Sequence, residues 1–154
     1  MASAAVTPTE LTEAELAAWR GFLRVHTALF RQLDAELEAA HNLPLSSYEV
    51  LIALRAAPGG RLRMADLAGR ALLSRSGMTR LVDRLERQGL LTRCSCSDDA
   101  RGCYAVLTEG AAALLDRARP THLDGVRARF LAHLDADDLE RLSTIWERML
   151  PQPD

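Results

Sequence analysis

Apolar side chains recur at helical spacing in one long stretch near each end of the chain. In residues 11–38 they form a single stripe that is sustained over about seven turns. A second stripe runs through residues 108–150 and contains Pro120, where we expect a kink or a break because proline has no N–H to donate. Stripes of this length need a larger apolar partner surface than a small domain usually offers.

The starts of several helices are marked by side chains that satisfy unpaired N–H groups. In a capping box, a residue before the helix and a residue three positions later bond each other's backbone N–H groups. Asn42 and Pro44 end the first long helix, and Thr108 caps the helix that follows the last strand. The pairs with this spacing are Thr12 with Glu15, Ser46 with Glu49, and Asp135 with Asp138.

Between the two long stripes the elements become shorter and the period changes. A loop at 57–60 is predicted by its Pro-Gly-Gly sequence, and a turn at 97–102 by its small and acidic residues. After Leu90 the pattern is typical of two strands that form a hairpin. The expected elements are, in chain order, a helix at 47–56, a strand at 61–63, helices at 64–72 and 74–88, and strands at 91–96 and 103–107.

The helix at 74–88 has the most asymmetric pattern of the chain. Its narrow apolar stripe consists of Met78, Leu81, Val82 and Leu85. Gly89 follows where a left-handed C-terminal cap belongs. The opposite face is polar and strongly basic, and it carries Arg75, Ser76, Thr79, Arg80, Arg84 and Arg87.

Charge is distributed unevenly along the chain. The formal net charge is −2, but nine arginines and five acids give residues 61–101 a charge of +4 and leave −6 on the remainder. A basic middle with acidic ends is expected where only the middle contacts a polyanion, although it also fits a mixed-charge solvated surface.

The helices at 64–72 and 74–88 form a helix-turn-helix, and the hairpin after them forms a wing.

These elements suit double-stranded DNA. Short polar side chains and arginine at the start of the second helix can reach base edges in a major groove. Arg101 at the wing tip can enter the minor groove. Arg61, Arg63, Arg84 and Arg87 are better placed to contact phosphates, which orients a protein on DNA without reading its sequence.

The residue pattern resembles that of the MarR family of winged helix-turn-helix regulators. The resemblance is carried by Leu67-Ala68, by the run from Leu73 to Glu86, and by Gly89-Leu90. It extends through the wing, where Asp99-Ala100-Arg101-Gly102 is similar to the family's D-x-R motif and Leu107-Thr108 to its entry into the fifth helix. In length and element order the resemblance covers about residues 11–150.

The resemblance implies a mainly α fold with a small β wing, in which a winged helix-turn-helix core is flanked by long N- and C-terminal dimerisation helices. The implied regions are a flexible N-terminus at 1–10, an N-terminal dimerisation helix at 11–45, a DNA-binding domain at 46–107 and C-terminal dimerisation helices at 108–154. Such a protein is a homodimeric, sequence-specific repressor, released from a pseudo-palindromic operator by a small aromatic or acidic ligand. Asp99 would hold Arg101 in the minor groove, and the implied base contacts are Ser74, Arg75, Ser76, Thr79 and Arg80.

The sequence offers candidate residues for two regulatory features, a ligand pocket and a redox switch. In the family the ligand pocket lies between the dimerisation helices and the winged domain, although each residue that could line it here also fits ordinary packing or surface roles. Cys94 and Cys96 occupy a wing strand where the family often has basic residues, and Cys103 lies on the returning strand. They could form a redox switch or simply be small strand residues. The candidate pocket residues are Trp19, Arg20, Arg24, His26, Phe30 and Tyr48.

Other function classes lack candidate residues. The four histidines are scattered singly on helices, the cysteine spacing matches no standard zinc site, and there is no phosphate-binding loop or nucleophile motif. We therefore expect no enzyme activity, no cofactor and no metal site. A chain without an apolar membrane span or a secretory signal is expected to be cytoplasmic, without a membrane partner. A winged-helix module that binds only proteins remains an alternative, which the arginine-rich face disfavours.

Overall fold

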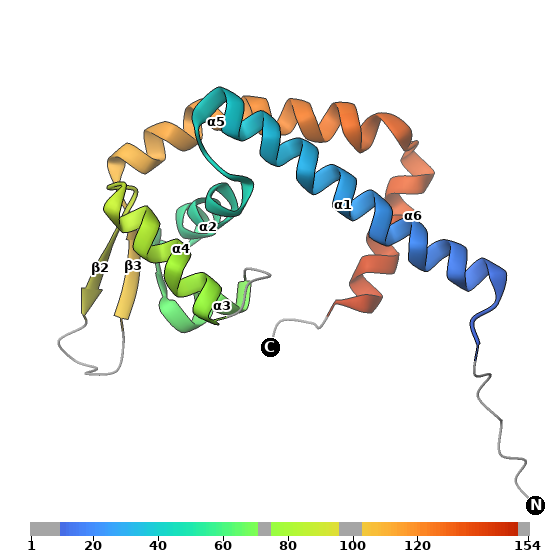
Figure 1. The fold of residues 1–154 in the computed structure, drawn as a ribbon, viewed down its shortest axis with the longest axis horizontal. Coiled ribbons are helices and arrows are strands. Elements are labelled where there is room, and N and C mark those ends of the chain that lie inside the picture. Colours follow the sequence, from blue (N-terminus) through green and yellow to red (C-terminus); the bar gives the residue numbers. More distant parts are fainter. Residues whose placement is uncertain (1–9, 71–74, 96–102, 151–154) are drawn as a thin grey trace, which may run out of the picture.

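The computed structural model describes residues 10–70, 75–95 and 103–150, and it places a small sheet and several short helices beneath two long crossing helices (Figure 1). Before the wing the elements are α1 (Glu13–His41), α2 (Leu45–Ala56), a 3-10 turn η1 (Pro58–Gly60), β1 (Arg61–Arg63), α3 (Met64–Arg70) and α4 (Arg75–Arg87). After α4 follow β2 (Leu91–Ser95), β3 (Cys103–Leu107), α5 (Glu109–Arg129), η2 (Leu131–His133) and α6 (Ala136–Met149). The predicted mainly α fold with a small β wing is confirmed.

Most of the predicted helix ends are confirmed. Both halves of the capping boxes of α1 and α6 are formed, and the hydrogen bonds that Thr12 donates lower the pKa of Glu15. Asn42 ends α1 in the left-handed conformation (φ 51°), and the Thr108 side chain caps α5. Local sequence therefore determines where these helices begin and end.

The predicted capping box at the start of α2 is wrong. The helix begins at Leu45, so Ser46 lies within its first turn, and the N-cap residue before the helix is Pro44, which forms no capping side-chain hydrogen bond. Instead the Leu45 N–H donates to Asp34 Oδ1 at 2.8 Å. The cap thus comes from α1, and it joins the start of α2 directly to that long helix.

Of the two outcomes expected at Pro120, the break is absent, because α5 continues from Glu109 to Arg129 without interruption, and the kink stays a prediction. Proline removes one hydrogen bond, to the carbonyl four residues earlier, and here both Pro120 and Asp116 are exposed, so water can satisfy that carbonyl. The helix ends at Arg129, and the residue that follows, Phe130, has a φ of −121° and a ψ of −61°, which are not helical.

The sheet is antiparallel, with β3 in the centre between β1 and β2. Leu62 pairs with Ala105, and both face the core. The tight passage from α4 into β2 depends on Gly89, whose φ of 70° is left-handed and favours glycine. The Gly89 and Leu90 N–H groups donate to Glu86 O and Leu85 O, which closes the end of α4 as predicted.

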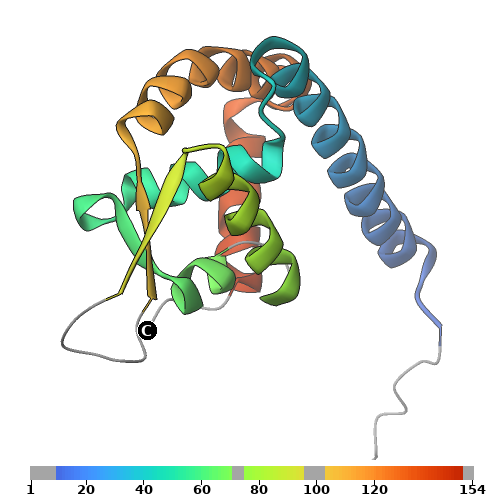
Figure 2. The same ribbon diagram turned by 60° about the vertical axis from the view of Figure 1, so that its left-hand side comes forward.

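The hydrophobic core is confined to one part of the molecule. Its buried side chains come from residues 37–118 and include Leu37, Leu54, Leu67, Leu85 and Leu115. The end of α1, the start of α5 and the winged elements share this one cluster. The N-terminal half of α1 projects away from it in both views (Figures 1 and 2).

The two long helices cross very closely at Gly125. A Cβ atom there would lie 2.7 Å from Leu33 Cδ2 and 2.5 Å from Glu36 Oε2, so the crossing has no room for a side chain. The Arg129 guanidinium forms an ion pair with Glu36 at the same place. The relative position of α1 and α5 is therefore fixed within this chain.

Candidate nucleic-acid interface

The outer face of α4 has the polar residues that the sequence predicted. Ser76, Thr79 and Arg80 are exposed. The predicted apolar stripe is buried, since Met78, Leu81, Val82 and Leu85 are each at most 6% exposed. Ser74 lies outside the described residues, and Arg75 is described only as the first helical residue.

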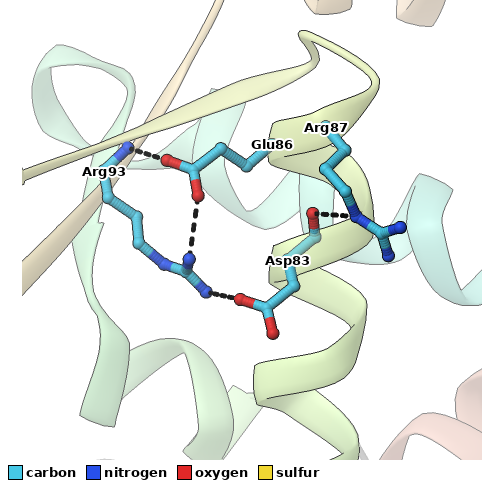
Figure 3. A network of polar contacts seen from close by, with 4 residues as sticks. All are labelled: Asp83, Glu86, Arg87 and Arg93. Atoms are coloured by element: carbon cyan, nitrogen blue, oxygen red, sulfur yellow. Dashed lines mark hydrogen bonds and ion pairs between the residues drawn. The ribbon is translucent and has the colours of Figure 1, made fainter.

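The acidic residues of α4 are paired with an arginine of the wing (Figure 3). Arg93 on β2 forms an ion pair with Asp83, donates from Nη1 to Glu86 Oε2 at 2.8 Å, and donates its backbone N–H to Glu86 Oε1. The hydrogen bond to Asp83 raises the pKa of Arg93 above its ordinary value. The network fixes β2 against α4 and compensates two carboxylates that would otherwise repel DNA phosphates.

Arg61 and Arg63 lie on the outer face of the sheet around Tyr104. Their guanidinium carbons are 5.4 and 5.6 Å from the centre of the Tyr104 ring, and Arg63 Nε donates to the Tyr104 hydroxyl at 2.9 Å. Arg63 and Tyr104 are direct partners in the β1–β3 register, whereas the neighbouring Leu62 faces the core. Tyr104 thus holds two arginines at the base of the wing. It was not among the residues predicted from the sequence, and the signal for it was the alternation of the strand, which places Tyr104 on the outer face of the sheet.

Arg84 differs from the other arginines of α4. Its side chain is half-buried, and Nη2 donates to Ser47 Oγ on α2 at 3.0 Å. Its Nε atom is buried without a hydrogen-bond partner in the described structure. Arg80 and Arg84 line a shallow groove of about 220 Å³ between α2 and α4. Arg87, one turn away, is exposed and donates from Nε to Asp83 O.

The tip of the wing, with Asp99, Arg101 and Cys96, lies outside the described residues. Cys94 and Cys103 are both exposed. Cys94 pairs with Tyr104, and Cys103 pairs with Ser95, so the two thiols lie on opposite faces of the hairpin. This register does not suit a disulfide between them, and the redox switch proposed for the three cysteines stays a prediction.

The six candidate pocket residues do not gather in one place. Aromatic rings follow one face of α1, with centroids 6.0 Å apart for Trp19 and Phe22, 6.1 Å for Phe22 and His26, and 4.9 Å for His26 and Phe30. Trp146 of α6 contacts this row at Phe22. An open apolar cavity of about 700 Å³ between α1, η2 and α6 is lined by Phe22, His26, Phe130, Leu142 and Trp146 among others. Arg20 and Arg24 are exposed on α1.

Tyr48 lies elsewhere, in the core between α2 and α5. It is 5% exposed, and its ring centre is 4.6 Å from that of His122. Burial raises the pKa of the Tyr48 hydroxyl and lowers the pKa of the His122 ring, whose Nδ1 atom is buried without a hydrogen-bond partner in the described structure. The pKa of Glu49 on α2 is raised, because its partial burial outweighs the opposing effect of the nearby His26.

Within residues 10–70, 75–95 and 103–150, no three His, Cys, Asp or Glu side chains lie close enough together to hold a metal ion. None of the helices in this part of the chain is both long and apolar enough to cross a membrane.

Similar structures place these features in a known family. The model of the MarR family matches residues 41–102. The fold is similar to that of AbsC, a MarR family transcriptional regulator from Streptomyces coelicolor, with 34% identity and a TM-score of 0.86 over 92% of this chain and 95% of the other. It is also similar to Sco3205 from the same organism, in complex with DNA, with 33% identity and a TM-score of 0.88 over 94% and 91%.

A named sequence relative agrees with these structures. The homoprotocatechuate degradative operon repressor of Escherichia coli is 29% identical over 71% of this chain and 72% of its own length. Regulators of this family bind DNA and are not enzymes. The chain belongs to the MarR family of winged-helix, DNA-binding transcriptional regulators.

Proposed function

We propose that this regulator is a homodimeric repressor that binds a pseudo-palindromic operator through α4 and leaves it when a small ligand binds. The observation that carries the proposal is the combination of an outward polar face on α4 with large apolar side chains left exposed on α1 and α6. The polar face of α4 is suited to a DNA groove, and the exposed apolar side chains are suited to a second protein surface.

The exposed side chains of α4 support direct reading of bases. Thr79 and Arg80 lie on its outward face, above a fully packed stripe that keeps the helix in place. Arginine can form two hydrogen bonds to guanine in the major groove. Arg61 and Arg63, held by Tyr104, are suited to adjacent phosphates. The family resemblance further implies base contacts by Ser74 and Arg75. It also implies a minor-groove contact by Arg101, which Asp99 would hold in place.

The apolar side chains outside the core support assembly with a second copy. Trp19, Phe22 and Val25 on α1 are 53%, 47% and 51% exposed, and Met149 near the end of α6 is 71% exposed. Because Phe22 and Val25 line the open apolar cavity between α1 and α6, a partner's helices that fill this cavity would cover them together. A two-fold dimer would present two copies of α4 to the two half-sites of a palindrome.

The proposed ligand is a small aromatic or acidic molecule. The Escherichia coli relative is named as the repressor of an operon for degrading homoprotocatechuate, an aromatic acid, and this supports a repressor with an aromatic or acidic ligand. The candidate ligand residues remain the α1 group, Trp19, Arg20, Arg24, His26 and Phe30, together with Tyr48. A ligand that stabilises a spacing of α4 helices unsuited to successive major grooves would lower DNA affinity.

The test is a fluorescence anisotropy titration with DNA flanking the chain's own gene, at two salt concentrations. We expect tight, salt-dependent binding that Arg80→Ala weakens by about tenfold or more, since a bidentate base contact contributes about 1–3 kcal/mol. Arg117→Ala, an exposed arginine on α5, is the matched control and should bind like the wild type. Equal binding by Arg80→Ala would contradict the proposed role of α4.

A further inference from the structure

Arg84 has surroundings that a DNA-contacting arginine does not need. Arg80 and Arg87, on the neighbouring turns of α4, are exposed, whereas Arg84 is half-buried and donates to Ser47 Oγ at 3.0 Å. Burying a guanidinium with an unpaired Nε has a free-energy cost that an exposed arginine avoids. A group kept at such a cost is expected to do something that an exposed charge cannot do.

Its partner belongs to the helix that connects the winged elements to the long helices. Ser47 is 1% exposed and is the one polar residue within the described buried set. Its helix, α2, is capped by Asp34 of α1 and packs against α5 through the contact of Tyr48 with His122. The bond from Arg84 to Ser47 therefore links α4, through α2, to both long helices.

The opposite link of α4 is the Arg93 network. It joins Asp83 and Glu86 to β2, on the wing side of the helix (Figure 3). With Arg93 on one side and Ser47 on the other, polar links constrain the rotation of α4 about its own axis, which packing of its apolar stripe alone leaves less defined. Hydrogen bonds are directional, whereas apolar contacts are not.

We propose that Arg84 is a positioning residue: its bond to Ser47 sets the orientation of α4 on α2, and with it the preference for operator over random DNA, and Arg84 makes no phosphate contact. This replaces the phosphate role expected from the sequence. The inference rests on the proposed reading of an operator by α4. Random-sequence binding depends on phosphate contacts, so it should not require the same orientation.

The experiment compares Arg84→Met with Arg87→Met, a matched exposed arginine on the same helix. Affinities for operator and for random DNA are measured by anisotropy at several salt concentrations. Arg84→Met should lower operator affinity by about tenfold, the equivalent of losing one well-placed base contact. Its affinity for random DNA and its salt dependence should match the wild type. A phosphate contact would instead reduce the slope of log affinity against log salt by about 0.9, and that outcome would overturn the proposal.

Ser47→Ala is the second variant, and it leaves every charge of the protein in place. It should reproduce the loss of operator preference, and the double variant Ser47→Ala with Arg84→Met should lose no more than Arg84→Met alone. Additive losses, or operator binding unchanged in Ser47→Ala, would count against the link. Thermal unfolding and sedimentation of each variant identify general damage, which would lower binding to both DNAs. Failure of the proposed function looks different, because the wild type itself would then show no preference for the operator.

Discussion

Apolar side chains are buried in the winged part of this molecule and exposed in its two arms, which are residues 11–30 and 130–150. Between residues 37 and 118 the large apolar residues close into one core, and side chains such as Leu51, Leu54 and Leu85 are fully buried. In the arms no described hydrophobic side chain is buried to that degree, and Trp19, Phe22 and Trp146 remain 53%, 47% and 36% exposed. Both parts have similar helical patterning, so the difference lies in what each part packs against.

The contrast separates two tasks that the same hydrophobic effect performs. The winged part gains its stability within one chain, whereas in the proposed dimer the arms would gain theirs when the partner covers them. Their junction is fixed within the chain by the close crossing at Gly125 and by the Asp34 cap on α2. Assembly of the arms would therefore set the spacing between two winged parts, because the junction in each chain would transmit the position of its arms to its winged part.

Charging the arms should have the largest effect. In the double variant Phe22→Asp with Trp146→Asp, two contacting apolar rings become carboxylates, which cannot be buried in a dimer interface without a large cost. We expect a monomer whose operator affinity falls by about 100-fold or more, because the two half-sites are no longer bound together. Size-exclusion chromatography with light scattering and anisotropy would measure both.

Ala113→Asp is the control for that variant, since it adds a carboxylate to an exposed position of α5 outside the arms. It should remain assembled and bind DNA normally. If the double variant also stayed a dimer, the arms would have to be covered in some other way.

The next effect concerns the winged core, measured in the monomeric background so that assembly does not contribute. Leu54→Ala should lower the free energy of unfolding by about 2–5 kcal/mol, because Leu54 is fully buried and its removal leaves a cavity. Trp19→Ala should change it by less than about 1 kcal/mol in the same background, since Trp19 is 53% exposed there. Urea denaturation measures both changes, and comparable losses would contradict the division into a closed and an open part.

A smaller effect is expected at the wing. Arg93→Met leaves Asp83 and Glu86 uncompensated beside the DNA, so operator and random DNA should both bind about tenfold more weakly at low salt, and less so at high salt. Adding Asp83→Asn and Glu86→Gln to this variant removes the repulsion and should restore much of the binding. No recovery in the triple variant would mean that Arg93 acts in another way, for example by holding β2.

The smallest effect is a pH dependence of stability from His122. Burial lowers its pKa in the folded protein below the ordinary 6.5, so the unfolded chain binds the proton more readily. The contribution is present above pH 6.5 and is lost as the pH falls through the window between 6.5 and the lowered value. Urea midpoints between about pH 8 and about pH 5.5 should fall more in the wild type than in His122→Gln. Parallel curves would contradict this role of His122.

The sequence predicted the features that depend on neighbouring residues. The capping boxes of α1 and α6, the left-handed cap at Gly89 and the buried stripe of α4 are confirmed because each needs only residues within one or two turns. The predicted start of α2 was wrong because the cap of this helix comes from Asp34, eleven positions before Leu45. Pro120 does not interrupt α5, because the effect of a proline within a helix depends on whether water can reach the preceding turn.

The candidate site could be predicted only in part, for the same reason. The outward face of α4 follows from helical period alone. The pairing of Arg93 with α4, of Arg63 with Tyr104 and of Arg84 with Ser47 depends on strand register and helix packing, which separate exposed arginines from half-buried ones. Arginine count and position in the sequence carry no such information.

The most direct test of the central claim, that the arms are an interface for a second copy, is sedimentation equilibrium of the full chain without DNA. The account predicts a single species of twice the 16.9 kDa chain mass, persisting on dilution to low micromolar concentration. A stable 16.9 kDa monomer at those concentrations would contradict it, because the exposed apolar side chains of α1 and α6 would then remain uncovered in solution.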